Sequence, residues 1–174
     1  MKALTFWKTV TVDEANLLES VISLLAEHQI SYCLIGGQAV NAYAEPVVSL
    51  DVDLAVVAEE VAGVERLLSD AFVVERFSHS LNVTLPESDV RIQVQTDPRY
   101  SEFPQRSAIR TVLGIQLPVA DVTDLLRGKV WAATDPDRRP SKRQKDLADI
   151  ARLLEVRPDL RANVPEEVLD RLVK

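Results

Sequence analysis

Residues 32–57 read YCLIGGQAVNAYAEPVVSLDVDLAVV, and this stretch decides the fold. An apolar run of strand length ends at Gly36-Gly37, and a second apolar run carries Asp51 and Asp53. Only a short helical segment separates the two runs. The pattern predicts two buried strands joined by a brief helix, with the aspartate pair next to the glycine turn on the adjacent strand.

Outside this stretch, apolar residues recur with helical period in some segments and alternate with polar residues in others. The predicted helices cover about 12–27, 38–44, 59–69, 121–133 and 141–157, and a short one follows Pro165. The predicted strands cover 32–35, 47–57, 72–74, 81–85, 90–95 and 115–119. This order is typical of an α+β (mixed α/β) fold with a central mixed sheet and helices packed on it. We predict one domain, 1–174, with an α/β core at 1–120 and C-terminal helices at 121–174 packed on that core.

The composition is that of a globular protein, with 47% apolar and 27% charged residues among 174. The net charge of −7 disfavours nucleic-acid binding by the whole chain, so any such binding would need a local basic patch. Cys33 is the single cysteine, which excludes an internal disulfide and fits a small buried side chain. No apolar run approaches membrane-spanning length and no signal-like segment begins the chain, so we expect a cytoplasmic protein without a membrane partner.

The aspartate pair is the strongest chemical feature. Residues two apart in a strand share a face, so Asp51 and Asp53 would repel each other in a buried setting unless a cation lies between them. Oxygen ligands favour Mg²⁺ or Mn²⁺ over zinc. The alternative is that the strand begins nearer Val52 and both carboxylates are solvated or bonded to backbone. The same pair also occurs in haloacid-dehalogenase-type phosphatases and in many glycosyltransferases.

The glycine turn suits phosphate binding, because glycine lets a phosphate approach the backbone and a helix N-terminus offers free N–H groups. The alternative is a plain tight turn. The spacing between Gly37 and Asp51 favours the first interpretation. A phosphate site beside a metal site is the arrangement that nucleoside triphosphate chemistry needs.

Residues 35–40, IGGQAV, and 49–54, SLDVDL, resemble the signature of the nucleotidyltransferase superfamily. The similarity is greatest to the branch of abortive-infection-toxin nucleotidyltransferases and continues through 125–154. The haloacid-dehalogenase interpretation is less favoured, because Leu54-Ala55 replaces the small hydroxyl residue expected two positions after the second aspartate. That family also lacks the upstream glycine turn.

The resemblance implies a triphosphate on the glycine turn, Mg²⁺ (or Mn²⁺) on the aspartate pair, and a third carboxylate on a later strand. The position expected for that carboxylate is Gln93, which can ligate Mg²⁺ but brings no charge and cannot act as a base. Asp97, just beyond the strand, could take its place. The alternative is that Arg91, Gln93 and Gln95 form the solvated face of an antiparallel sheet.

A basic segment stands out in this acidic chain. It consists of Arg138, Arg139, Lys142, Arg143 and Lys145. Cations near the start of a helix oppose its dipole, which favours an anionic partner such as a triphosphate or an RNA backbone. The alternative is pairing along the helix at i, i+4 spacing, Lys142 with Asp146 and Lys145 with Asp149.

The resemblance further implies that a helical lysine and a later Lys-Asp pair reach the nucleotide, and Lys129 and Lys145-Asp146 match these positions. The predicted catalytic residues are Asp51, Asp53, Asp97 and Lys129, with Asp51 and Asp53 as metal ligands. The predicted nucleotide-binding residues are Gly36, Gly37, Gln38, Ser49, Gln93, Arg143, Lys145 and Asp146.

The leading hypothesis is a metal-dependent nucleotidyltransferase that moves a nucleoside monophosphate from a nucleoside triphosphate to an acceptor hydroxyl. The family analogy suggests a toxin that acts on tRNA or protein and has an antitoxin-like partner. The alternative is a degenerate module of the same fold that binds nucleotide, RNA or a partner protein without turnover. A phosphatase or nuclease would need an activated water and a base, and the sequence offers no clear base.

Overall fold

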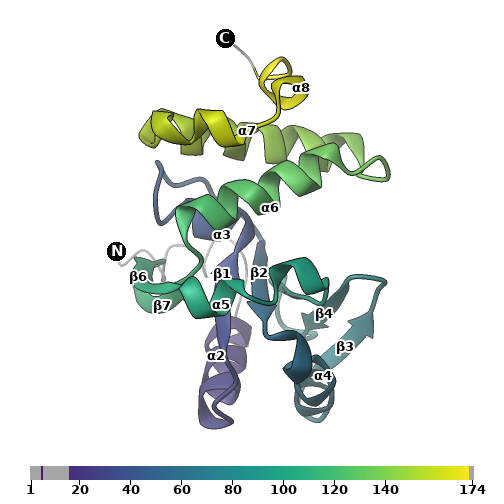
Figure 1. Ribbon diagram of the computed structural model, residues 1–174. Helices are drawn as coiled ribbons and strands as arrows, with labels where there is room; N and C mark the ends of the chain where they lie inside the picture. The colour runs from purple at the N-terminus through teal and green to yellow at the C-terminus, as the bar shows by residue number, and fades with distance from the viewer. Residues whose placement is uncertain (1–4, 6–15, 173–174) are drawn as a thin grey trace.

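The computed structural model describes residue 5 and residues 16–172. Within them, seven strands form one mixed sheet in the order β3-β4-β5-β2-β1-β7-β6. The strands are β1 (Tyr32–Ile35), β2 (Asp51–Val56), β3 (Val73–Arg76), β4 (Ser80–Thr84), β5 (Arg91–Gln95), β6 (Ala108–Val112) and β7 (Ile115–Val119). Together with its helices this sheet confirms the predicted mixed α/β fold (Figure 1).

Helices lie beyond both ends of the central strands. The α-helices are α2 (Leu17–Glu27), α3 (Gly36–Val40), α4 (Val61–Ser69), α5 (Phe103–Arg106), α6 (Val122–Thr134), α7 (Pro140–Val156) and α8 (Glu166–Leu169). The 3-10 helices are η1 (Ala58–Glu60), η2 (Pro98–Tyr100) and η3 (Pro158–Asn163). In Figure 1, α6 and α7 lie together at the top, above α3, whereas α2 and α4 lie at the bottom. Among the described residues, no helix is both long and apolar enough to cross a bilayer.

The strand pairings explain how the quoted stretch organises the sheet. β1 and β2 pair antiparallel around α3, and β2 then pairs in parallel with β5, as β1 does with β7. β1 and β2 are therefore central, which agrees with their almost continuous apolar sequence. β4 and β5 pair antiparallel, as the alternating pattern predicts.

Some predicted boundaries are wrong for identifiable reasons. The second strand begins at Asp51 instead of residue 47, because the Asn41 side chain binds both the backbone N–H and the carbonyl of Val47 and holds 47–50 as a loop. β6 was not predicted, since four of its five side chains are exposed at the sheet edge and show no alternation. The helix predicted over 12–27 begins at Leu17 in the described part, and 12–15 lie outside it.

One cluster of buried apolar side chains joins the sheet to the helices on either side of it. Its largest fully buried members include Leu34, Leu54, Ile92, Leu126 and Ile150. Cys33 is also buried in this cluster, and burial raises the pKa of its thiol to about 12. The thiol is therefore a packing group, as the sequence predicts.

The core position of Ile92 gives a stability prediction. Ile92 is fully buried in β5, whereas Ile109 in the edge strand β6 is 63% exposed. We expect Ile92→Ala to lower the free energy of unfolding by about 2–5 kcal/mol through lost burial and a residual cavity. Ile109→Ala, the matched control, should change it by less than about 0.5 kcal/mol. Urea denaturation measures both values, and similar effects of the two changes would contradict the placement of β5 in the core.

Candidate active site

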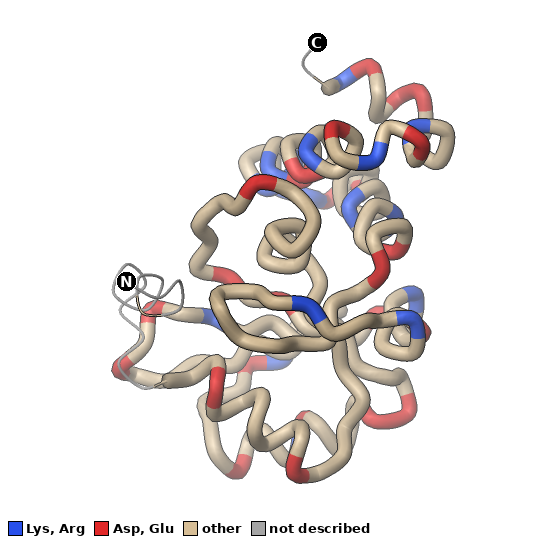
Figure 2. The backbone as a smooth tube through the Cα atoms, turned by 90° about the vertical axis from the view of Figure 1, so that its left-hand side faces the viewer, with Lys and Arg blue, Asp and Glu red and all other residues tan. Residues whose placement is uncertain are grey.

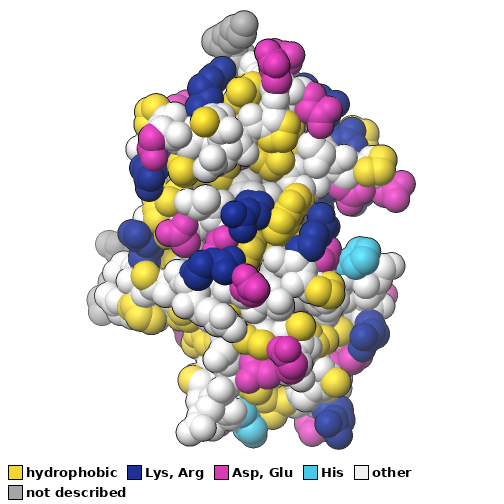
Figure 3. All heavy atoms as spheres, in the orientation of Figure 1, with side chains coloured by type: hydrophobic (Ala, Val, Ile, Leu, Met, Phe, Trp, Pro, Cys, Tyr) yellow, Lys and Arg dark blue, Asp and Glu magenta, His cyan; other side chains and the backbone are white. Residues whose placement is uncertain are grey.

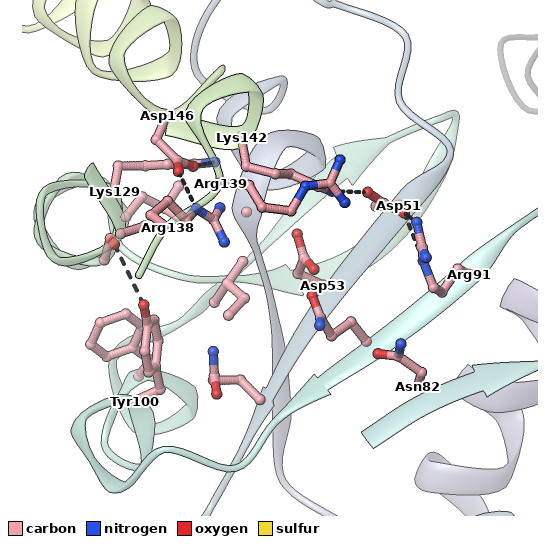
Figure 4. Close-up of a pocket in the computed structure, with 18 residues that line it drawn as sticks. Asp51, Asp53, Asn82, Arg91, Tyr100, Lys129, Arg138, Arg139, Lys142 and Asp146 are labelled. Atoms are coloured by element: carbon pink, nitrogen blue, oxygen red, sulfur yellow. Dashed lines mark hydrogen bonds and ion pairs between the residues drawn. The ribbon is translucent and has the colours of Figure 1, made fainter. Parts of the chain in front are cut away.

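A cavity of about 280 Å³ lies between the sheet and helices α6 and α7. Five cationic side chains line it: Arg91, Lys129, Arg138, Arg139 and Lys142. Three acidic side chains, Asp51, Asp53 and Asp146, lie among them (Figure 4). Figure 2 shows basic residues gathered in the upper helices, and Figure 3 shows Lys and Arg side chains grouped near the middle of one face. The cavity is thus a locally cationic region of a chain whose net charge is −7.

Asp51 begins β2, and two cations bind its carboxylate. Arg91 donates from Nε and Nη2 to Oδ1 at 3.0 and 2.7 Å, and Lys142 Nζ lies 2.8 Å from Oδ2. Burial alone would raise the pKa of Asp51, but the hydrogen bonds from Lys142 and Arg91 outweigh it and hold the pKa below its usual value. Asp51 is therefore ionised at neutral pH.

Asp53 lies two residues further along the same face and has a different environment. Among the described residues, no side chain forms an ion pair with it. Burial raises the pKa of Asp53 to about 6, and the Asp51 charge adds to the rise, whereas Lys129 and Lys142 oppose it. The aspartate pair therefore consists of one neutralised carboxylate and one that lacks a direct partner.

Gly36 allows Asp53 to occupy this position. Its φ of +69° lies in the left-handed region, and a Cβ placed there would be 2.0 Å from Asp53 Oδ2. The carboxylate thus packs directly against the backbone of the turn. Gly37 follows as part of α3, a helix of only five residues. So short a helix contributes little dipole, and Gly36 makes room for the Asp53 carboxylate.

The loop between α3 and β2 is fixed by buried polar contacts. Gln38 is 1% exposed and donates from Nε2 to the Ser49 carbonyl at 3.0 Å. The Asp51 backbone N–H donates to Ser49 Oγ at 3.3 Å, and Arg152 donates to Asn41 Oδ1 at 2.7 Å. The structure therefore places Gln38 and Ser49 where they position the start of β2.

An ion-pair network joins α6 to α7 above the aspartates. Lys129 Nζ lies 3.1 Å from Asp146 Oδ1 and 2.7 Å from Asp149 Oδ2. Arg138 Nε donates to Asp146 Oδ2 at 2.8 Å. Burial disfavours the charged form of Lys129, but Asp149 and Asp146 outweigh this and raise its pKa. Asp146 and Asp149 therefore both form ion pairs with Lys129 of α6 and not with the lysines of α7. The alternative pairing of Lys142 with Asp146 is wrong, because Lys142 binds Asp51 instead.

Of the other predicted site residues, Gln93 lines the cavity, whereas Asp97 and Arg143 form contacts elsewhere. Gln93 lies directly beside Asp53, since β2 and β5 pair these positions. Asp97 does not reach the cavity: it caps η2 and binds Arg99, with Nη2 to Oδ2 at 2.7 Å. Arg143 also points elsewhere, because its Nη2 donates to the Asp135 carbonyl at 2.8 Å.

Lys145 lines a second cavity of about 200 Å³ on the other side of Lys142 and Arg138. Gly37 and Ser49 also line this second cavity, which shares Asp51 and Asp53 with the first. Within the described residues, no group of three or more His, Cys, Asp or Glu side chains forms a metal site.

Comparison with known families agrees with this arrangement. The model of the family described as "Nucleotidyl transferase AbiEii toxin, Type IV TA system" matches residues 24–174. The chain belongs to this family. Membership in the AbiEii family confirms the resemblance found in the glycine turn and the aspartate pair. No curated protein sequence matches the chain.

Solved structures similar to this AbiEii-family chain are nucleotidyltransferases or are described as resembling them. Lincomycin-bound lincosamide antibiotic adenylyltransferase LnuA is 15% identical with a TM-score of 0.55, over 84% of this chain and 99% of that chain. ANT(2")-Ia in complex with adenylyl-2"-tobramycin is 16% identical with a TM-score of 0.54, over 84% and 96%. An antigenic nucleotidyltransferase-like protein from Paracoccidioides brasiliensis is 18% identical with a TM-score of 0.53, over 92% and 87%. At these identities the likeness concerns the fold.

Sequence reasoning missed several residues that line the cavity. Asn82 comes from β4, and Tyr100 and Phe103 come from the segment after β5. Tyr100 donates to the Gly128 carbonyl at 3.4 Å, and a Cβ on Gly128 would lie 3.1 Å from the Tyr100 ring. No sequence motif marks these residues. Only the alternation in 81–85 gave a signal, because it put Asn82 on a polar face.

The contact between Gly36 and Asp53 gives a second prediction. We expect Gly36→Ala to lower the free energy of unfolding by at least about 1–2 kcal/mol, because alanine is strained at this φ and its Cβ must displace the Asp53 carboxylate. Gly63→Ala in α4 is the matched control, since no atom lies within 4 Å of its added Cβ. That change should raise stability by about 0.5–1 kcal/mol. Thermal denaturation followed by circular dichroism distinguishes the two, and equal stability of Gly36→Ala and wild type would disprove the contact.

The raised pKa of Asp53 gives a third prediction. Because the pKa rises from 3.8 to about 6 on folding, Asp53 favours the folded state fully below about pH 4, and this contribution is lost as the pH rises through about 6. Asp53→Asn removes the charge, so this variant should be more stable than wild type near pH 7 by about 1–3 kcal/mol, with no difference near pH 4. Urea denaturation across this pH range, without divalent metal, measures the effect.

Asp51→Asn is the control of opposite sign. The pKa of Asp51 is lowered, so its charge stabilises the folded state above its usual pKa, and this stability is lost as the pH falls. Asp51→Asn should therefore be less stable than wild type at neutral pH. A stability gain of Asp53→Asn that did not depend on pH would contradict the proposed environment of that carboxyl.

Proposed function

We propose that this chain transfers a nucleoside monophosphate from a nucleoside triphosphate to an acceptor hydroxyl, with Mg²⁺ (or Mn²⁺) held by Asp51 and Asp53. The observation that carries the proposal is the aspartate pair beside Gly36, facing five cationic side chains in one cavity. Membership in a nucleotidyltransferase family supports it. Carboxylates for a metal and cations for phosphates are the two parts that nucleotidyl transfer requires.

The cationic side chains fit a triphosphate. Among the described residues, the Arg139 guanidinium forms no ion pair, so it is available to an incoming anion. Lys142 and Arg91 neutralise Asp51 in the absence of nucleotide, and both are long, mobile side chains that can bind phosphate oxygens instead. Lys129 and Arg138 form ion pairs with Asp146, which hold these two cations in fixed positions on the helix side of the cavity.

The oxygen donors fit one hard cation. Mg²⁺ in phosphate-transfer sites is commonly held by one or two carboxylates together with substrate phosphates and water. Asp51 and Asp53 supply two carboxylates, and no described side chain forms an ion pair with Asp53. Gln93, next to Asp53, can add a neutral oxygen but not the charge that a second ion would need. When bound, the ion would neutralise the phosphates and polarise the α-phosphate.

In the reaction, the acceptor oxygen forms a bond to the α-phosphorus while the bond to the β-phosphate oxygen breaks and pyrophosphate leaves. Arg139, Lys142 and Arg138 offset the charge on the departing phosphates, and the rigid Gly36 turn fixes Asp53 for in-line alignment. Gln93 cannot take the proton of the acceptor hydroxyl, so this proton passes to solvent water or to the departing pyrophosphate. Because the family is one of toxins, we propose an RNA or protein hydroxyl as acceptor and an antitoxin as partner.

One observation favours a second candidate function. Gln93 occupies the position beside Asp53 where the superfamily pattern has a carboxylate, and Asp97 does not replace it. A module that binds nucleotide, RNA or a partner protein without turnover would need no base there. The two candidates share the binding site and differ only in the chemical step.

Removing the deeper carboxylate tests the shared site. We expect Asp53→Ala to abolish Mg²⁺-dependent binding of ribonucleoside triphosphates, a loss of more than about 100-fold in affinity, because the ion loses a ligand. Calorimetric titration of all four triphosphates, with and without Mg²⁺ or Mn²⁺, measures it. Asp70→Asn, an exposed position at the end of α4, is the matched control and should bind as wild type does.

Turnover separates the two candidates once binding is established. Release of pyrophosphate from bound nucleotide in the presence of RNA or protein acceptors would support the transferase. Binding without pyrophosphate release would favour the degenerate module. Unchanged metal-dependent binding by folded Asp53→Ala would refute the assignment of the site itself.

A further inference from the structure

The sheet side of the cavity, level with Gln93, contains an amide oxygen that has no hydrogen-bond partner among the described residues. Asn82 lines the cavity from β4, opposite Gln93 in the strand register. Its Oδ1 is buried and accepts no hydrogen bond from the residues that the structure describes. Buried polar atoms are nearly always satisfied in folded proteins, so this oxygen can still accept a hydrogen bond from a donor that reaches it from the cavity. Figure 4 shows the Asn82 amide below Arg91, on the same side of the sheet as Asp53.

Two further amides extend this wall along β5. Gln93 donates from Nε2 to Ser80 Oγ at 3.0 Å, which leaves its oxygen available. Gln95 accepts from the Thr96 backbone N–H at 3.1 Å through Oε1, which leaves its NH₂ group available. Both residues line the cavity. The amide wall formed by Asn82, Gln93 and Gln95 therefore offers both acceptors and donors and has no charge.

The position of the amide wall relative to the cations decides what it can bind. Every second residue of β5 faces the cavity, namely Arg91, Gln93 and Gln95. The distance along the strand from the cationic Arg91 to the uncharged Gln95 is about 13 Å, and Asn82 lies level with Gln93. An acceptor oxygen such as Asn82 Oδ1 repels phosphate and needs an N–H or O–H donor. The nearly buried apolar side chains of Phe103 and Leu125 also line this cavity.

We propose that the amide wall is a nucleobase subsite, in which Asn82 reads the donor and acceptor groups of a base edge. A side-chain amide presents a donor and an acceptor side by side, and it can therefore form paired hydrogen bonds with a base. The subsite rests on the proposed function, since the cationic end would hold the phosphates of the same ligand. Two sources can supply the base: the nucleoside triphosphate, or the 3′-terminal nucleoside of an RNA acceptor.

The test compares base preference in two series of ligands with Mg²⁺ present. The first series contains the four ribonucleoside triphosphates and inorganic tripolyphosphate, which has no base. The second contains short RNA oligonucleotides that differ only in the 3′-terminal base, followed by fluorescence anisotropy. Wild type should prefer one base by about tenfold or more in at least one series, as expected for one or two hydrogen bonds.

Asn82→Ala and Asn82→Ser should reduce that preference to within about threefold and leave tripolyphosphate binding unchanged. Gln116→Ala is the matched control, because this amide lies on the same sheet, in β7, and outside both cavities. It should bind as wild type does. Asn82→Ala should also unfold at the same or a higher temperature, because it removes a buried oxygen that has no partner.

The outcomes distinguish the subsite from the proposed function. If triphosphates bind but both Asn82 variants keep the wild-type base preference, or wild type has no preference in either series, the subsite is refuted and the transferase survives. If neither triphosphate nor tripolyphosphate binds while the RNA preference depends on Asn82, the subsite stands and the nucleotide-donor role fails. A lower unfolding temperature of Asn82→Ala with unchanged preference indicates a purely structural role and overturns the proposal.

Discussion

The structure depends on keeping two carboxylates side by side in the central strand of a sheet. Asp51 and Asp53 share one face of β2, and their mutual repulsion must be offset by cations from elsewhere in the chain. Arg91 comes from the neighbouring strand, and Lys142 comes from α7. The C-terminal helices are thus bound to the sheet by charge as well as by apolar packing. The same cations line the cavity and make it locally cationic.

This arrangement keeps several groups in states that do not serve stability. Burial raises the pKa of Asp53 to about 6, and Asn82 Oδ1 has no hydrogen-bond partner within the described part of the chain. Gly36 is held at a positive φ so that Asp53 can pack against it. Unfavourable states of this kind persist where the surrounding structure fixes them, and they concentrate at functional sites. Gly36, Asp53 and Asn82 all line the same cavity. The unfavourable states of these residues therefore point to the same site as the glycine turn and the aspartate pair.

Gln93 is the point at which this chain differs from the superfamily pattern. It lies beside Asp53, so the strand register is kept while the charge is lost. A neutral amide there lies between Asp53 on β2 and Asn82 on β4 in the strand register. Gln93 therefore has two effects: the strand offers no carboxylate base at this position, and it offers an amide that can form hydrogen bonds.

The sequence by itself determined the glycine turn, the two central strands, the mixed α/β class and the family, because these follow from local apolar patterns and a short motif. It also placed Gln93 opposite the aspartates through the resemblance. Only the tertiary structure decided that Lys142 binds Asp51 and not Asp146, that Asp97 and Arg143 bind elsewhere, and that Asn82 enters the cavity. The physical reason is that these contacts join residues far apart in the chain. They depend on β5 pairing with β2 and on how α7 docks, and neither hydrophobic period nor local spacing specifies such pairings.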